Sequence, residues 1–235
     1  VAVFEVDEAA VRPLAPRLRP RLLIVTNLAR DQLDRFGELA TTAAHAAAAV
    51  RHAGVAVLNA DDPLVAEMAS EAAEVRFFGA APSIRRAMPH DSSLYGAGAE
   101  PVAPPDLDLR LERSDPDGDG QVIELAAASG ERATARLQVP GPYNGYNAAA
   151  AVLAAGELGV PLGRAVAALE ATRPAFGRGQ VVDYRGRRVK LLLVKNPAGF
   201  NQAIRLLAAL PPGAPVLVAI NDLDADGRDV SWLWD

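Results

Sequence analysis

A chain of 235 residues is long enough for one large domain or two small ones, and folding would bury about 70% of its unfolded surface. It contains no cysteine, which excludes disulfides, thiolate zinc sites and a cysteine nucleophile. The net charge is −5 without a basic run, so we expect no nucleic-acid partner. We find no apolar stretch of about 18 residues and no signal-peptide pattern, which indicates a cytoplasmic protein.

The first residues predict a buried strand that carries an acid. Val1 to Val6 have the apolar character of such a strand, and Asp7 and Glu8 then open a helix. A carboxylate inside a buried strand is costly unless it has a partner. We therefore expect Glu5 to lie beside a cation or a metal ion, or at the end of the strand.

The stretch from Leu22 to Leu39 predicts the ligand-binding edge of a sheet. Leu22 to Thr26 has the length of a buried strand, and a helix is expected to open at Asp31. Open α/β sheets bind ligands where such a strand runs into a polar turn and a helix. Asn27 and Asp31 are therefore candidates for substrate contact. The alternative is an ordinary helix start, because Asp is favoured in the first helical turn.

A second strand ends in the same way. A long alanine-rich helix from Asp31 to His52 leads into the strand Val55 to Leu58, which Asn59, Asp61 and Asp62 follow. These polar side chains suit the ligand edge of the same sheet. A capped helix start would explain one of the two acids, but not both together with Asn59.

The middle of the chain predicts an irregular insertion and then an antiparallel meander. A third strand lies at Val75–Phe78, and residues 80–105 are rich in Pro, Gly, Ala and Ser without periodicity. Three runs of strand character follow: Leu107–Arg113, Gln121–Ala127 and Arg132–Val139.

Two asparagines then stand at the start of a helix. Asn144 can cap it, and Asn147 opens a helix that runs to Leu158 and ends at Gly159. A side-chain amide offers a donor and an acceptor together, so it can read the edge of adenine. Capping needs one asparagine, not two at this spacing, so Asn144 and Asn147 are candidates for nucleotide binding.

The last part of the chain predicts a second, smaller domain. After a hinge near Arg173–Gly179 come strands at Gln180–Tyr184 and Val189–Val194. A helix and a buried strand at Pro215–Ile220 would complete a β-α-β unit with parallel strands and a right-handed crossover. Asn196 follows the first strand of this unit and is a further candidate for substrate contact.

Four motifs resemble those of a known family. Residues 26–34 read TNLARDQLD, residues 59–63 read NADDP, and residues 141–151 fit G-x-x-N-x-x-N-x-x-A-A. These three are similar to the Mur ligases, the ATP-dependent enzymes that extend peptidoglycan peptides. The fourth, VKNPAGFNQ followed by ND-x-x-ADGRD-x-SWLWD, resembles the C-terminal domain of the MurT-type branch, the synthetase subunits of lipid II isoglutaminyl synthase. The resemblance extends from Glu5 to Asp235.

The resemblance implies an α/β fold in two parts. Residues 1–174 would be the ATP-binding central domain, a mostly parallel sheet with helices plus the antiparallel meander and the insertion at 80–105. Residues 175–235 would be a smaller, Rossmann-like α/β domain, which we expect to be incomplete. The family's phosphate loop, G-x-x-G-K-[ST], is not in the sequence and lies upstream of the matching first strand, so we expect these residues to hold half of the nucleotide site.

The resemblance also implies roles for single residues. Glu5 would bind Mg²⁺ beside the ATP phosphates, Asn144 and Asn147 would bind the adenine, and Arg178 would reach the phosphates. Gln32 stands where most Mur ligases carry a metal-binding His, and Leu192 stands where others hold the ribose with an Asp. Those two contacts are therefore not carried over.

The implied reaction is an amidation. ATP would phosphorylate the α-carboxyl of D-glutamate in the lipid II stem peptide, and ammonia would displace the phosphate to give D-isoglutamine. A GatD-type glutaminase subunit would supply the ammonia. The resemblance implies that an Asp of the acidic loop, Asp229 first and Asp226 second, orients the partner's catalytic His. Trp232 and Trp234 would anchor the interface. The alternative for these acids is a solvated turn.

Two other functions stay open at this stage. One is a different Mur-like amide ligase, of the folylpolyglutamate synthase type, which would add an amino acid in place of ammonia. The WLWD ending and Gln32 argue against it. The other is a non-catalytic paralogue that binds a partner without turning over ATP.

Overall fold

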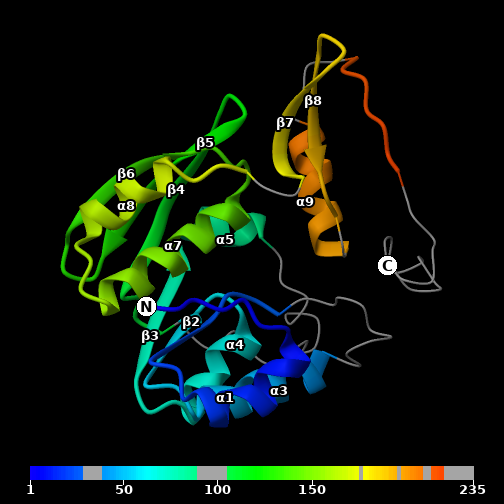
Figure 1. Ribbon diagram of the computed structural model, residues 1–235. Helices are drawn as coiled ribbons and strands as arrows, with labels where there is room; N and C mark the ends of the chain where they lie inside the picture. The colour runs from blue at the N-terminus through cyan, green and yellow to red at the C-terminus, as the bar shows by residue number, and fades with distance from the viewer. Residues whose placement is uncertain (29–38, 89–104, 175–176, 195–196, 209–212, 220–235) are drawn as a thin grey trace.

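The computed structural model describes residues 1–28, 39–88, 105–174, 177–194, 197–208 and 213–219 (Figure 1). The elements up to the third strand are α1 (Glu8–Leu18), β1 (Leu22–Val25), α3 (Leu39–Val50), β2 (Val55–Asn59), α4 (Pro63–Glu67), the 3₁₀ helix η1 (Met68–Glu71) and β3 (Val75–Ala80). Those after it are α5 (Pro82–Ala87), β4 (Leu109–Asp117), β5 (Gly120–Ala127), β6 (Arg132–Leu137), α7 (Pro142–Glu157), α8 (Leu162–Glu170), β7 (Arg178–Tyr184), β8 (Arg187–Leu192) and α9 (Pro197–Ala208).

Six of the described strands form one sheet in the order β1-β2-β3-β4-β5-β6. The first four strands are parallel, with Leu22 opposite Val55 at the β1–β2 pair. The last three form an antiparallel meander. This confirms the predicted α/β fold, a mostly parallel sheet followed by a meander.

Helices cover both faces of the parallel half of the sheet. Successive residues of a strand point to opposite faces, and β2 shows the result. Val57 packs in a core that includes α7 and α8, whereas Leu58 packs in a second core that includes α3 and α4. Both side chains are fully buried. This burial on two faces explains why β2 reads as a continuous apolar run.

Alanine lets α7 approach the sheet closely. Ala148, Ala149 and Ala150 are buried against it, and a Cβ at Gly145 would lie 2.8 Å from a methyl group of Leu111 on β4. Tyr146, at 5% exposure, is a large buried side chain of this alanine-rich helix. The close packing holds the start of α7 over the end of the parallel strands, which positions the site described below.

A smaller unit follows α8. β7 and β8 form an antiparallel hairpin, and α9 follows it in the chain (Figure 1). Asp119, at the turn between β4 and β5, forms ion pairs with Arg188 and Lys190 of β8. These charges connect the hairpin to the larger sheet.

The predicted strand at Val1–Val6 is wrong. The segment has no regular structure, and the exposed fractions of Val1, Val3 and Phe4 are 106%, 90% and 68%. A strand needs a neighbour that pairs with its backbone groups. In the described sheet, β1 pairs with β2 alone, so residues 1–6 have no such neighbour there. The helix expected after them is present as α1, which the Asp7 carboxylate caps by accepting from the Ala9 amide at 3.0 Å.

The strand predicted at Pro215–Ile220 is absent from the part of it that the structure describes. Residues 215–219 are irregular, and Leu217 is 93% exposed. The described part of the smaller unit therefore contains an antiparallel hairpin and a helix rather than a parallel β-α-β unit. An apolar run supplies the pattern of a strand, but pairing with a neighbour decides whether one forms.

Two further differences concern helices. Within the segment expected to be irregular, Pro82–Ala87 forms α5, which begins at a proline and buries Ile84. α7 begins at Pro142 rather than at Asn147, so Gly141 is its N-cap and Asn144 lies in its first turn. Proline is favoured at the first helical position because its missing N–H is not needed there.

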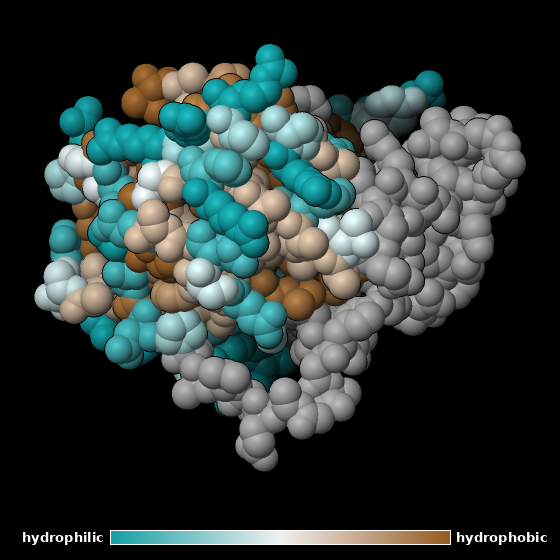
Figure 2. All heavy atoms as spheres, turned by 90° about the horizontal axis from the view of Figure 1, so that it is seen from below, coloured by the Kyte–Doolittle hydropathy of each residue, from teal (hydrophilic) through white to brown (hydrophobic). Residues whose placement is uncertain are grey.

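The surface that carries α1 and α3 mixes hydrophilic and hydrophobic residues, as the view from below shows (Figure 2). Such mixing is usual for a folded protein, since apolar atoms make up roughly half of most protein surfaces. None of the described helices is long and apolar enough to cross a membrane.

Candidate functional site

The polar residues after β2 bind the neighbouring strand ends. The Asn59 amide donates to the Thr26 carbonyl at 2.8 Å and accepts from the Asp61 amide at 3.0 Å. Asp62 accepts from the Leu28 amide at 2.8 Å, and its other oxygen caps α4. Both side chains are almost fully buried. Asn59 and Asp62 therefore connect the ends of β1 and β2. Asp62 also caps the start of α4, so the alternative reading of a capped helix start is correct for this residue.

Asp61 connects three further elements. One carboxylate oxygen accepts from the Ala80 amide at the end of β3 at 2.7 Å and from the Tyr146 hydroxyl of α7 at 2.8 Å. The other oxygen lies 3.6 Å from a guanidinium nitrogen of Arg85 on α5. Burial and the neighbouring Asp61 carboxylate raise the pKa of Tyr146. The phenol thus stays protonated and donates to Asp61 at neutral pH.

The start of α7 carries the two predicted nucleotide-binding asparagines. The Asn144 amide nitrogen donates to the Pro140 carbonyl at 2.6 Å. The side chain of Asn147, one helical turn later, is exposed and forms no hydrogen bond with another residue in the described part of the chain. Side chains three apart on a helix share a face. Among the described residues, the Asn144 side chain is therefore held by the protein and the Asn147 side chain is not.

Arg178, the hinge arginine, lies at the start of β7 and close to this helix start. Its charge acts on Tyr143 of α7: burial raises the pKa of that phenol, and Asn144 and Arg178 oppose the rise. Arg178 itself is exposed. The next residue, Gly179, packs against Pro140, since a Cβ there would lie 2.5 Å from the proline ring. The structure thus brings Arg178 close to the helix start that carries Asn144 and Asn147, although Arg178 lies more than 30 positions later in the sequence.

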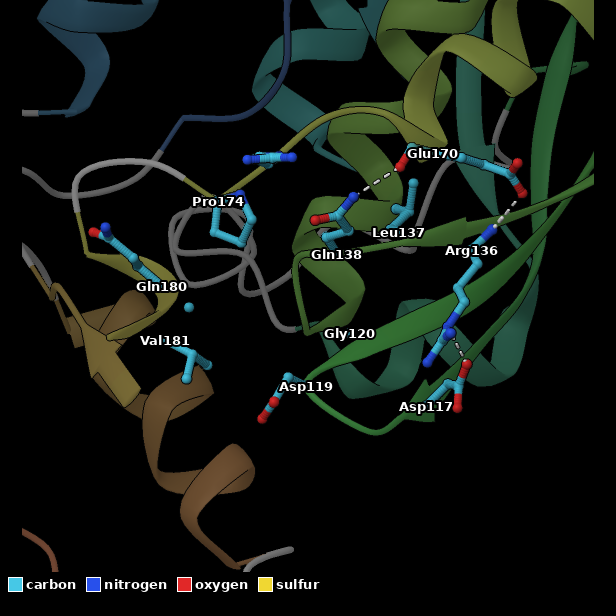
Figure 3. A pocket seen from close by; sticks show the side chains of 12 residues that line it. Asp117, Asp119, Gly120, Arg136, Leu137, Gln138, Glu170, Pro174, Gln180 and Val181 are labelled. Carbon is cyan, nitrogen blue, oxygen red and sulfur yellow. Dashed lines mark hydrogen bonds and ion pairs between the residues drawn. The ribbon is translucent and has the colours of Figure 1, made fainter. Parts of the chain in front are cut away.

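A polar hollow of about 880 Å³ lies between the larger sheet and β7 (Figure 3). Arg136 pairs with Asp117 at 2.6 Å on one side of it, and the Gln138 amide donates to the Glu170 carbonyl at 2.9 Å. The three residues predicted to bind the nucleotide do not line this hollow. Its lining is Asp117, Asp119, Gly120, Arg136, Leu137, Gln138, Glu170, Arg173, Pro174, Gly179, Gln180 and Val181.

The other predicted site residues that the structure describes, Glu5 and Asn27, are both exposed. Glu5 lies in the irregular N-terminal segment, and Asn27 lies at the end of β1. Among the described residues, no three or more His, Cys, Asp or Glu side chains gather as a metal site. Several predictions lie outside the described residues: Asp31, Asn196, Asp226, Asp229, Trp232 and Trp234.

Sequence reasoning missed three residues that build this site. Tyr146 and Arg85 hold Asp61, and Gln121 of β5 holds the turn before α7. One signal was present, because a tyrosine inside a run of alanines has a hydroxyl that needs a buried partner. Nothing in the local sequence of Gln121 or Arg85 distinguishes them from surface residues.

An open α/β sheet that carries polar groups where its parallel strands end is the architecture of ligand-binding α/β proteins. Here a helix start that carries two asparagines and a second small unit are added to that sheet. The chain belongs to the Mur ligase family: the family model for the Mur ligase middle domain matches residues 1–155, and the model for the MurT ligase C-terminal region matches residues 193–235.

Known relatives agree with this assignment. The chain is 30% identical to the MurT subunit of lipid II isoglutaminyl synthase (glutamine-hydrolyzing) from Streptococcus pneumoniae and 25% identical to that from Staphylococcus aureus, and both alignments cover all of the chain. The chain spans 57% and 58% of the length of these two relatives. The crystal structure of MurF from Acinetobacter baumannii matches 86% of the chain and 40% of MurF with a TM-score of 0.66 and 21% identity, which shows the shared fold.

Proposed function

We propose that this chain is the nucleotide-binding part of a synthetase subunit that amidates the lipid II stem peptide with ATP and ammonia. The observation that carries the proposal is the similarity to the MurT subunits over the full chain, together with the MurT ligase C-terminal match. The α-carboxylate of D-glutamate would attack the γ-phosphorus of ATP, which forms an acyl phosphate and releases ADP. Ammonia would then attack the carbonyl carbon, and phosphate would leave as the amide of D-isoglutamine forms.

The start of α7 supports an adenine nucleotide as one substrate. The Asn147 amide is exposed and forms no hydrogen bond to another described residue, and Asn144 lies on the same face one turn earlier. Arg178 adds an exposed cation beside them, which suits an anionic phosphate. These residues would bind and orient the nucleotide.

Magnesium fits the exposed Glu5 carboxylate. Mg²⁺ keeps several of its waters and is usually held by one or two carboxylates together with substrate phosphates. A single carboxylate such as Glu5 is therefore an adequate protein ligand, although the described residues form no larger cluster. The ion would neutralise phosphate charge when it is bound. Glu5→Gln is expected to keep the fold and lose magnesium-dependent turnover.

The ammonia would come from a GatD-type glutaminase. These 235 residues contain no cysteine, which agrees with a separate glutaminase that would supply the cysteine nucleophile for glutamine hydrolysis. An Asp near the end of this chain, Asp229 with Asp226 second, would complete the partner's Cys–His pair. The subunit would act in the cytoplasm, where ATP is supplied.

The test is amidation of a lipid II substrate by the natural protein, co-purified with its glutaminase and followed by mass spectrometry. Wild type should form the amide with either glutamine or free ammonia. Asp229→Asn should retain amidation from free ammonia and lose amidation from glutamine. If neither source gives amide while the two chains still bind each other, the chain is a non-catalytic partner and the proposed reaction is wrong. Incorporation of an amino acid in place of ammonia would instead indicate the folylpolyglutamate synthase type.

A further inference from the structure

Gln121 holds the turn that leads into α7. Its side chain, on β5, is 1% exposed. The amide nitrogen donates to the carbonyls of Val139 at 3.0 Å and Gly141 at 2.8 Å, so both of its hydrogens are used. The amide oxygen accepts from the Ser114 hydroxyl at 2.6 Å. A buried amide that uses both of its donors and also accepts at its oxygen is a rigid support.

The strand that carries Gln121 is itself fixed beside the turn. Its neighbour Gly120 approaches β6 so closely that a Cβ there would lie 2.0 Å from the Leu137 carbonyl oxygen. Gly141 has a φ of +91°, and a Cβ on it would lie 2.6 Å from the Tyr143 ring. The turn therefore has little room to shift while the bonds from Gln121 are in place.

Two candidate nucleotide-binding residues depend on this turn. Asn144 donates to the Pro140 carbonyl, which lies between the two carbonyls that Gln121 binds. Gly179, the neighbour of Arg178, packs on the Pro140 ring. A change in the turn would therefore move Asn144 and Arg178 together.

The bond to Pro140 also sets which end of the Asn144 amide faces a ligand. One hydrogen of its nitrogen goes to the Pro140 carbonyl, and the Asn144 side chain also hydrogen-bonds with the Tyr143 hydroxyl, so its oxygen is an end left to accept a hydrogen bond from a ligand. Adenine offers a donor at its exocyclic amine, whereas guanine has a carbonyl oxygen at the same position. A fixed acceptor favours adenine.

We propose that Gln121 is a positioning residue of the nucleotide site: its amide fixes turn 139–141 and, through it, the orientation of Asn144 and Arg178 toward an adenine nucleotide. This inference rests on the proposed function. It adds a residue that does not touch the nucleotide and acts through the two residues that would.

The test compares Gln121→Met with Val65→Ala in the natural protein. Methionine keeps the length of the side chain and removes both donors. Val65 is fully buried in the core on the other face of the sheet, so its truncation destabilises the fold without touching the turn. The affinities of each variant for fluorescent ATP and GTP analogues are measured at a temperature at which both variants are fully folded. The deuterium uptake of residues 139–147 is measured in the absence of nucleotide.

For Gln121→Met we expect roughly tenfold weaker ATP binding, which is the effect of losing one well-placed hydrogen bond. We also expect a smaller preference for ATP over GTP and faster deuterium uptake in the turn. Val65→Ala should match wild type in all three. Wild-type affinity, selectivity and uptake in Gln121→Met would show that Gln121 is a structural residue only and overturn the inference. Should Gln121→Met not fold, Ser114→Ala frees the oxygen end of the same amide, and the same three readouts should change in the same direction by a smaller factor.

The outcomes separate this inference from the proposed function. If wild type binds ATP but Gln121→Met is unaffected, the positioning role fails and the proposed function stands. If wild type binds neither nucleotide, the proposed function fails and the nucleotide role of Gln121 fails with it. The exchange measurement then still reports whether Gln121 orders the turn.

Discussion

The end of β2 and the start of α7 both carry polar side chains that suggest a ligand site, but the structure uses them differently. Asn59, Asp61 and Asp62 are buried, and bind strand ends and helices. Asn147 is exposed and unengaged among the described residues. We infer from this difference that polar residues at a strand end stabilise the fold, as part of its scaffold, when their hydrogen bonds are formed within the protein. A polar side chain that is exposed, and forms no hydrogen bond within the described part of the protein, is the better candidate for ligand contact.

The largest expected effect is from Asp61→Ala. It leaves the Ala80 amide and the Tyr146 hydroxyl buried without an acceptor, so the free energy of unfolding should fall by about 3 kcal/mol in urea denaturation. Asp115→Ala on the exposed part of β4 is the matched control, and its effect should be within about 0.5 kcal/mol. Equal stability of the two variants would mean that Asp61 is not part of the scaffold.

Asn147→Ala should weaken nucleotide binding and leave the stability of the fold almost unchanged, in contrast to Asp61→Ala. Loss of a hydrogen bond to the base should weaken ATP binding about tenfold, or ~1.4 kcal/mol, by calorimetry. The free energy of unfolding should change by less than about 0.5 kcal/mol, because the side chain is exposed. Asn201→Ala, an exposed asparagine on α9, controls for the substitution itself. A variant with wild-type ATP affinity would remove Asn147 from the site.

Tyr146→Phe tests the connection between the two regions. Losing the hydroxyl should lower the free energy of unfolding by about 1 kcal/mol at neutral pH. The raised pKa adds a pH dependence: above the ordinary value of about 10, the unfolded phenol ionises while the folded one stays protonated, so wild type loses stability as pH rises. The Tyr146→Phe variant has no phenol at this position and does not lose stability in this way. The difference in unfolding free energy between wild type and the variant should therefore narrow above about pH 10. A difference in unfolding free energy that stays constant over that range would contradict the raised pKa of Tyr146.

The smallest expected effect is from Arg85→Gln. The arginine is 39% exposed and lies 3.6 Å from Asp61, so the pair should contribute about 0.5 kcal/mol or less. Thermal unfolding at low and high salt measures it, and the difference from wild type should shrink as salt is added. A large effect that salt does not change would mean that Arg85 is as much part of the scaffold as Tyr146.

Local pattern predicted most of the larger sheet correctly. The runs at Leu22–Val25 and Val55–Leu58 form parallel strands, and the three runs after the insertion form the meander. The same reasoning was wrong at Val1–Val6 and at Pro215–Ala219, which are irregular and exposed. Apolar periodicity describes a segment that could be a strand, whereas a strand forms only beside a neighbour.

The sequence by itself determined the family, the α/β class and the pair of asparagines at the start of α7, because each of these is expressed in residues close together along the chain. Only the tertiary structure decided which polar residues are scaffold. Asp61 meets Tyr146 across 85 positions, and Gln121 meets Gly141 across 20. Such pairs leave no local pattern, since a buried hydrogen bond depends on where the packed core brings two groups and not on their distance along the chain.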